Sequence, residues 1–414
     1  MTTNSTYQPR RPLPPPLKGR DPGSFAQHSV IVRMPGIARR VLAENRFPAH
    51  IAAQLQALIR EIPESPIRPL SDSASPDTVA WLSYVKAYAG LNWLDIPWFF
   101  AETYFYRRIL EATGYFQPGE THGVDPYRRQ KQLGLETSWA TVRALAARQS
   151  AWLEDDSDRE TAVADLVAIS LWGNRADLSL WPADQAKHQA EERLVAARRH
   201  VIADDTEAVT RHAAAACPTA RFDILADNAG FELVCDLCLA DYLLSSHTAA
   251  TVRFHLKTHP TFVSDAITTD VEQTVATLSA AKDSQVQALG GRLQTHLASG
   301  RLQLRPHPFW TSPLSLWEMP PSLRQELSRS YLIISKGDAN YRRLLGDRHW
   351  PYTTPFADIL CYTPAPLVAL RTLKSEVAAG LTPDKISWLD TQDPDWLTDG
   401  RWGVVQFQAL PGPE

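Results

Sequence analysis

The chain has 414 residues, 44% of them hydrophobic and 21% charged, so it can bury a large core and should form two or three domains. Its 42 Lys and Arg against 46 Asp and Glu give a net charge of −4, which argues against a bulk positive field for nucleic acid or anionic membrane. We therefore expect a small or locally recognised substrate, while the oligomeric state stays open.

Cellular location is constrained by what the sequence lacks. No run approaches the ~18 apolar residues of a transmembrane helix, and the first 23 residues contain no apolar signal core. Four cysteines in so long a chain are too few for a disulfide framework, which fits a reducing compartment. We expect a cytoplasmic protein, with the nucleus as the alternative.

The first half of the chain is predicted to be helical after a flexible arm. Residues 1–23 contain six prolines and almost no apolar periodicity, which is typical of an extended, mobile segment. Residues 24–205 repeat apolar residues at intervals of three and four, which predicts an α-helical domain. The helical segments are HIAAQLQALIREI, TVAWLSYVKAYAGL, WFFAETYFYRRILEATGYF, SWATVRALAARQSAWLEDD and DRETAVADLVAISLWGNRADL.

Residues 206–414 change character, because short β-rich runs alternate with helical ones. This alternation predicts a three-layer α/β/α sandwich with a mostly parallel sheet. The expected strands are FDILA (222–226), TVRFHLK (251–257), RLQLRP (301–306), YLIIS (331–335), FADILCY (356–362) and WGVVQFQ (402–408). The expected helices between them cover residues 230–246, 269–299, 340–346 and 366–380.

Hard oxygen donors follow two of the expected strands. Asp227 and Asn228 come after FDILA, and Asp265 lies in the loop after TVRFHLK. In open α/β sheets, ligands bind at the carboxyl ends of the strands, and such oxygens suit Mg²⁺, Mn²⁺ or a similar ion. Asp and Asn are also common turn and cap residues, so this pair alone is a weak signal.

Cationic side chains are expected at the same rim. Lys336 and Arg342 follow YLIIS, and Lys374 follows FADILCY. Arg can grip a phosphate with two hydrogen bonds, and Lys acts as a point charge. Carboxylates that hold a metal beside cations that hold an anion are what phosphoryl transfer needs. Hydrolysis of a phosphomonoester is the resulting hypothesis.

A second candidate metal motif is set aside. Cys235 and Cys238 have zinc or redox spacing, but they lie on a helical apolar stripe. Free cysteine behaves as a small hydrophobic residue, so we expect both to pack in the core.

The segments DNAGFE, FHLK, FVSD, KGDANYRRL and RTLK together resemble the damage-control phosphatases of the domain-of-unknown-function-89 family. The subfamily that the chain resembles is the acidic-residue-methyltransferase-like one, which is marked by RTxK, and Arg371 to Lys374 fit this motif. PWFFAETYFYRRI, DPYRRQK and LWGNRADLSL are also similar to it, so the resemblance spans nearly the whole chain. It implies a metal held by catalytic Asp227, Asn228 and Asp265. It implies these substrate-binding residues: Asp227, Asn228, Glu232, Asp338, Ala339, Asn340, Tyr341, Arg342 and Lys374.

The resemblance implies a metal-dependent phosphatase for sugar phosphates such as fructose 1-phosphate or fructose 6-phosphate, in metabolite damage control. Mn²⁺, Co²⁺, Ni²⁺ or Mg²⁺ would be the cofactor, and Asp338 and Asn340 would bond sugar hydroxyls. Glu232 resembles a position linked to S-adenosylmethionine, so a protein-glutamate carboxyl methyltransferase is the alternative. It ranks second, because a cationic methyl donor needs neither a metal nor cations. Thr261 and Ala339 depart from the subfamily pattern, so the substrate preference stays open. The residues also do not decide whether an aspartate or a metal-bound water is the nucleophile.

Overall fold

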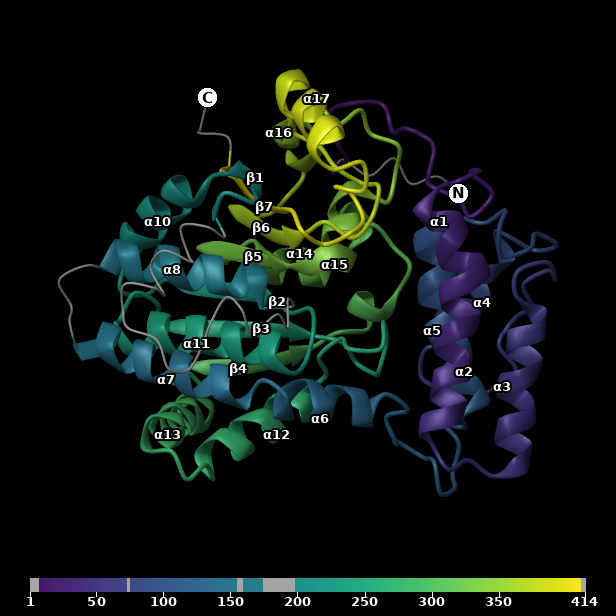
Figure 1. The fold of residues 1–414 in the computed structure, drawn as a ribbon, viewed down its shortest axis with the longest axis horizontal. Helices are drawn as coiled ribbons and strands as arrows, with labels where there is room; N and C mark the ends of the chain where they lie inside the picture. The colour runs from purple at the N-terminus through teal and green to yellow at the C-terminus, as the bar shows by residue number, and fades with distance from the viewer. Residues whose placement is uncertain (1–6, 73–74, 155–158, 174–197, 411–414) are drawn as a thin grey trace.

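The first part of the chain forms a helical bundle. The computed structural model describes residues 7–72, 75–154, 159–173 and 198–410, and Figure 1 shows the bundle beside a sheet covered by helices. Helix α5 is buried along its whole length, as expected for a helix surrounded by others. The bundle consists of α1 (Phe25–His28), the π turn η1 (Ser29–Arg33), α2 (Met34–Glu44), α3 (Ala49–Glu61), α4 (Thr78–Lys86) and α5 (Trp98–Ala112).

The described part of the chain also contains a seven-stranded sheet with the order β1-β7-β6-β5-β2-β3-β4. All neighbouring strands are parallel except β6 and β7. Helices cover both faces, so the predicted α/β sandwich with a mostly parallel sheet and an N-terminal helical region is confirmed. The strands are β1 (Val201–Asp204), β2 (Arg221–Leu225), β3 (Thr251–Leu256), β4 (Leu302–Pro306), β5 (Leu332–Lys336), β6 (Leu367–Thr372) and β7 (Gly403–Gln408).

Alternate residues of the strands enter two hydrophobic cores, as the two-residue period of a strand requires. Phe222 and Ile224 pack with one set of helices. This set comprises α7 (Trp139–Glu154), α8 (Arg159–Trp172), α10 (Thr206–Ala214), α11 (Phe231–Ser245), α12 (Thr268–Ser279) and α13 (Ser284–Ala298).

The opposite face shares one core with the helical bundle, because Leu225 and Ile333 pack into the same cluster as the bundle residues. The elements that cover this face or border it are η4 (Pro308–Thr311), η5 (Leu316–Glu318), α14 (Pro321–Leu327), α15 (Gly337–Leu345), α16 (Phe356–Leu360) and α17 (Pro383–Gln392). Helix α6 (Arg128–Glu136) connects the bundle to α7.

Three sequence expectations about the elements are wrong, and one strand was missed. FADILCY contains the helix α16, whose buried Phe356, Ile359 and Leu360 have helical spacing. The predicted helix 366–380 begins with β6, a strand buried on both faces, and such strands show a continuous apolar run without alternation. The short strand β1 was missed, and residues 269–299 form two helices, the second capped by Asp283.

The described residues of the N-terminal segment contact the C-terminal part of the chain. The amide of Arg10 donates to the carbonyl of Asp358, and the amide of Leu17 to that of Asp347. Helices α7 and α8 contact α11 and α13, which cover the sheet. The division into residues 1–23, 24–205 and 206–414, and the mobility of the first segment, stay predictions.

Candidate functional site

The sequence motifs meet where the order of the strands reverses. The chain passes from β2 through β3 to β4 on one side, and β5 then returns to the other side of β2. The carboxyl ends of two such strands leave a crevice between their loops, where α/β proteins bind ligands. Asp227 comes two residues after β2, and Gly337 directly after β5. The site therefore follows from topology as well as from motifs.

Asp227 and Gly337 are in close contact across this crevice. A Cβ atom added to Gly337 would lie 1.9 Å from Asp227 Oδ2, and the φ angle of Gly337 is +77°. Both the contact and the left-handed backbone require glycine here. The glycine in KGDANYRRL thus makes room for the carboxylate in DNAGFE.

Backbone pairing brings the three predicted metal ligands together. Asn228 and Asp265 form an antiparallel bridge. The amide of Ala266 donates to the carbonyl of Asp227 at 2.7 Å, and the amide of Ala229 to that of Ser264 at 2.7 Å. The loop after β3 is therefore fixed to the loop after β2.

The loop that carries Asp265 has a strained backbone. Phe262 and Val263 have φ angles of +46° and +66°, a region that is a true outlier for a β-branched residue such as valine. The ring of Phe262 lies 6.0 Å from that of Phe99 and 5.0 Å from that of Tyr106, both on α5. Packing on the helical bundle thus contributes to holding the loop.

Negative charge is concentrated at the crevice. Asp227 is 6% exposed and Asp265 1%. Asn228 Nδ2 donates to Asp227 Oδ2 at 2.7 Å and to Glu232 Oε2 at 2.8 Å. Burial raises the pKa of Asp227 well above its usual value, and the carboxylates of Glu232 and Asp265 raise it further. Like charges therefore oppose one another in a place with little water.

Two buried lysines balance part of this charge. Lys257 Nζ lies 3.2 Å from Asp265 Oδ2, and Lys336 Nζ lies 3.3 Å from Glu232 and 3.1 Å from Asp236. Burial raises the pKa of Asp265 in spite of Lys257. Sequence reasoning gave Lys257 no role, although it is the last residue of FHLK, at the end of a strand where the other site residues were sought.

The RTLK motif is organised around Asp338. Asp338 Oδ1 accepts hydrogen bonds from Arg371 Nε at 2.8 Å, Ser375 Oγ at 2.9 Å and the Lys374 amide at 3.3 Å. Burial would raise the pKa of Asp338, but Arg371 and Arg342 hold it below its usual value. The half-buried Lys374 side chain makes no ion pair with a described residue, so its ammonium is available to an anion.

The remaining residues of KGDANYR contact other parts of the protein. Asn340 Nδ2 donates to backbone carbonyls, including that of Ala226 at 3.2 Å, and Tyr341 OH donates to Gln406 at 2.8 Å. Arg342 pairs with Glu102 and Asp347. Ala339 is half-buried. Contacts of these four residues with a substrate stay predictions.

The donor atoms suit a hard divalent cation. Carboxylate and amide oxygens are the ligands such ions prefer, and the Asp227 carboxylate is buried close to those of Glu232 and Asp265, which raise its pKa beyond the effect of burial. The predicted set contains two carboxylates and one amide. Among the described residues, no three His, Cys, Asp or Glu side chains are grouped so as to hold a metal, and Cys235 and Cys238 are free and buried in the core.

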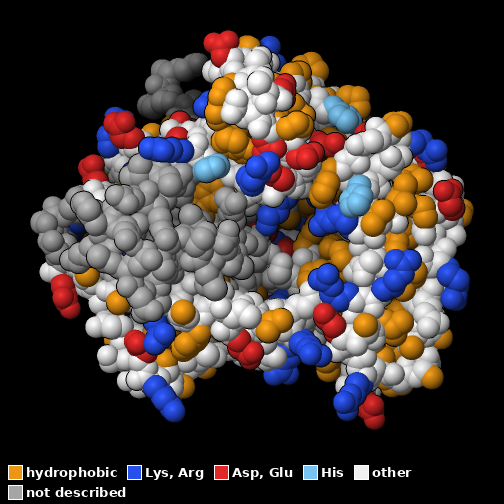
Figure 2. Space-filling model, viewed as in Figure 1, with side chains coloured by type: hydrophobic (Ala, Val, Ile, Leu, Met, Phe, Trp, Pro, Cys, Tyr) orange, Lys and Arg blue, Asp and Glu red, His pale blue; other side chains and the backbone are white. Residues whose placement is uncertain are grey.

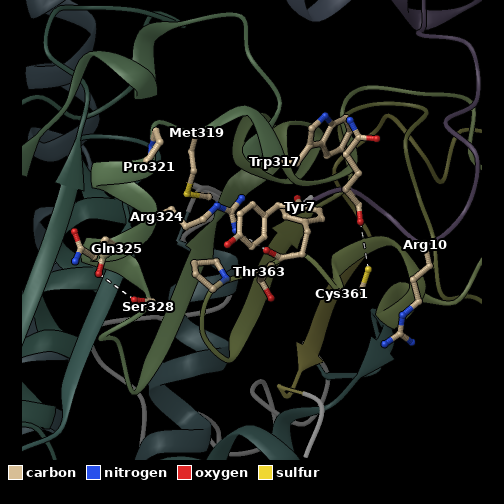
Figure 3. Close-up of a pocket in the computed structure, with 13 residues that line it drawn as sticks. Tyr7, Arg10, Trp317, Met319, Pro321, Arg324, Gln325, Ser328, Cys361 and Thr363 are labelled. Carbon is tan, nitrogen blue, oxygen red and sulfur yellow. Dashed lines mark hydrogen bonds between the residues drawn. The ribbon is translucent and has the colours of Figure 1, made fainter. Parts of the chain in front are cut away.

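One open cavity lined by described residues lies away from this crevice. A cavity of about 810 Å³ lies between the N-terminal segment and α14, with Tyr7 stacked on Arg324, and Cys361 lies further along it toward Arg10 (Figure 3). Figure 2 shows a hollow between the helical bundle and the rest of the molecule, bordered by basic and acidic side chains. No described helix is both long and apolar enough to cross a membrane.

Known proteins resemble this chain over nearly its full length. The "Damage-control phosphatase ARMT1-like domain" family matches residues 30–387. Damage-control phosphatase ARMT1 of Mus musculus is 34% identical, covering 95% of this chain and 98% of the relative. The human protein of the same name is 31% identical, covering 96% and 99%.

A solved structure also matches at a lower level. The crystal structure of a protein of the domain-of-unknown-function-89 family from Pyrococcus horikoshii has a TM-score of 0.47 and 15% identity, covering 85% of this chain and 92% of that chain. The sequence matches to the family and to the curated relatives show that the chain belongs to the damage-control phosphatase ARMT1-like family.

Proposed function

We propose that this protein is a metal-dependent phosphatase that hydrolyses sugar phosphates of the fructose 1-phosphate or fructose 6-phosphate type in metabolite damage control. The observation that carries the proposal is the gathering of buried carboxylates at the switch point of the sheet, beside Lys374, whose side chain forms no ion pair with a described residue. Relatives over the whole length of the chain are named damage-control phosphatases. The names of these relatives support the phosphatase class, and the chemistry of the site supports the metal.

The residues divide into a metal side and an anion side. Asp227, Asn228 and Asp265 would hold the cation, and a bound Mg²⁺, Mn²⁺, Co²⁺ or Ni²⁺ would supply Lewis-acid polarisation of the phosphoryl group. Lys374 would bind the phosphoryl oxygens as a point charge. Asp338 accepts a hydrogen bond from the Lys374 amide, and the Lys374 ammonium is near enough to lower the pKa of Asp227.

Other lysines at the site are assigned a supporting role. Lys336 lies between two buried carboxylates and bonds the carbonyl of Ser170, so it holds Glu232 and Asp236 in place. Lys257 does the same for Asp265. Substrate contacts from Asp338, Asn340 and Arg342 remain part of the proposal, as does a cytoplasmic location.

The alternative is transfer of a methyl group from S-adenosylmethionine to protein glutamate, with Glu232 as a binding residue. One oxygen of Glu232 accepts from Asn228 and the other faces Lys336. Both oxygens are thus engaged in holding the site, which leaves the phosphatase as the better-supported function.

The decisive experiment crosses a panel of sugar phosphates with a panel of divalent metals. We expect phosphate release with Mn²⁺, Co²⁺, Ni²⁺ or Mg²⁺ and its loss on chelation. Asp227→Ala and Asp265→Ala should each abolish this activity, because each removes a ligand of the cation. Circular dichroism of each variant would show whether the fold is kept.

Two results would contradict the proposal. Either variant could retain metal-stimulated activity while folded, or the wild type could transfer labelled methyl groups without metal and release no phosphate. A further readout does not depend on turnover: metal should raise the melting temperature of the wild type by ligand linkage, and should not raise that of Asp265→Ala.

A further inference from the structure

One face of the sheet is strongly polar at its β2–β3–β4 end. Strand pairing places Asp223 beside Arg253 and Arg253 beside Gln303, and His255 beside Arg305. The covering helix on this side is the short α14, which follows 3₁₀ turns. A cleft of about 290 Å³ remains, lined by Arg221, Arg253, Arg305, Ser322, Gln325, Glu326 and Arg329.

The neutral side chain of Gln303 holds two of these guanidinium groups side by side. Gln303 Oε1 accepts from Arg253 Nε at 2.9 Å and from Arg305 Nη2 at 3.0 Å. One amide oxygen therefore fixes two like charges next to each other. Such an arrangement costs electrostatic free energy in the absence of an anion.

The carboxylates near the cleft compensate only part of its charge. Glu326 is the single acidic residue among the lining residues, and its Oε1 lies 3.0 Å from Arg253 Nη1 and 4.0 Å from Arg305 Nε. Asp223 is fully buried beneath the cleft and pairs with Arg221 and His255.

Two arginines keep hydrogen-bonding capacity toward solvent. The exposed Arg329 forms no side-chain ion pair with a described residue, and Arg305 is only at the limit of contact with Glu326. Burial lowers the pKa of Arg253, and Arg221 and Arg305 lower it further. The cleft is therefore only partly compensated and carries net positive charge, on a chain whose net charge is −4.

We propose that this arginine cleft is a second ligand site, which binds a small phosphorylated or phosphate-like oxyanion. Guanidinium groups match the geometry of phosphate oxygens and bind them with paired hydrogen bonds. The volume of about 290 Å³ accommodates a phosphate group with a small organic part.

The cleft is separate from the candidate active site. Arg221 begins β2, and Asp227 lies six residues further on, which is about 20 Å along an extended chain. The lining residues include none of the proposed metal ligands or Lys374. The inference therefore stands whether or not the proposed phosphatase function is correct.

Isothermal titration calorimetry with inorganic phosphate tests the proposal, on the full chain at low ionic strength with a chelator. Arg305→Gln/Arg329→Gln should weaken this binding by at least tenfold, because it removes two of the cationic donors. The matched control is Arg39→Gln/Arg60→Gln, which removes the same charge from exposed positions on α2 and α3 and should bind as the wild type does. Arg305→Lys/Arg329→Lys should restore part of the affinity.

Two further arms locate and identify the ligand. Lys374→Gln, at the candidate active site, should retain the binding that Arg305→Gln/Arg329→Gln loses. Titration with glycerol phosphate in place of inorganic phosphate shows whether the cleft prefers a phosphomonoester or the free anion. Either preference is consistent with the proposed site. Equal phosphate affinity in the wild type and in Arg305→Gln/Arg329→Gln would overturn the proposal, as would binding of single-stranded RNA or a phosphopeptide but not of either small anion.

Discussion

Two buried ionic regions lie at opposite ends of the KGDANYR segment. Positive and negative charges are paired in one of them, and like charges lie close together in the other. At its C-terminal end, Arg342 is matched by Glu102 and Asp347 and stacks at 3.6 Å on Trp98. At its N-terminal end, Gly337 contacts Asp227 in a crevice where three carboxylates crowd together. The ion pairs of Arg342 join α15 to the helical bundle. The carboxylates around Asp227 lack such partners in equal number and are available to bind a cation.

The difference shows how burial can serve stability or binding. Removing one member of a matched buried pair leaves a charge without compensation, which is strongly destabilising. Removing one of several crowded like charges relieves repulsion. Substitutions in the two regions should therefore change stability in different directions.

The largest effect is expected for Arg342→Ala. The substitution leaves Glu102 and Asp347 buried without their cation, so the free energy of unfolding should fall by about 3–5 kcal/mol. Denaturant unfolding followed by circular dichroism measures this change. Arg211→Ala is the matched control, because it breaks an exposed helical pair with Glu207 and should cost about 0.5 kcal/mol or less. Similar effects of the two substitutions would contradict the distinction.

A pH-dependent effect is expected for Glu111→Gln. Glu111 is a matched charge that contacts Arg68 Nη2 at 2.7 Å and Arg108 Nε at 3.0 Å. Burial would raise the pKa of Glu111, but the hydrogen bonds from Arg68 and from the Ser71 amide lower it to about 2 from 4.5. The variant should be less stable than the wild type by about 1–3 kcal/mol at pH 7.

The sign of the pH dependence follows from this lowered pKa. Between about 4.5 and 2 the unfolded Glu111 binds a proton that the folded one does not, so the stabilisation is complete above pH 4.5 and is lost below it. Urea unfolding at pH 7, 4 and 3 should show the stability difference between wild type and variant shrinking once the pH falls below about 4.5. A difference that stays constant would contradict the assignment.

The smallest effect is expected for Asp227→Asn in protein treated with a chelator. This substitution keeps the shape of the side chain and removes one of the crowded charges, so stability should be unchanged or rise by up to about 1 kcal/mol. Asp236→Asn is the contrasting control, because Asp236 contacts Lys336 at 3.1 Å and accepts from Ser170. At pH 8 the Asp236→Asn substitution should lower the free energy of unfolding. A larger loss of stability in Asp227→Asn than in Asp236→Asn would contradict the comparison.

Sequence patterns predicted most of the fold and the neighbourhood of the site. The strand FDILA and the loop after it placed Asp227 and Asn228 correctly, because a buried strand followed by polar residues is a local signal. The pattern around RTLK was misread, since β6 is buried on both faces and shows no alternation. Lys374 nevertheless lies just after a strand, but this strand is β6 and not the expected FADILCY, which forms the helix α16.

The sequence by itself determined the residue types at the site, the parallel α/β class and the family, because these depend on local patterns and motifs. Only the tertiary structure decided which charges are matched. Lys257 meets Asp265, Lys336 meets Asp236, and Arg342 meets Glu102, which lies 240 residues away in the chain. Such pairings depend on how the helical bundle packs against the sheet, and no local pattern of residues encodes that packing.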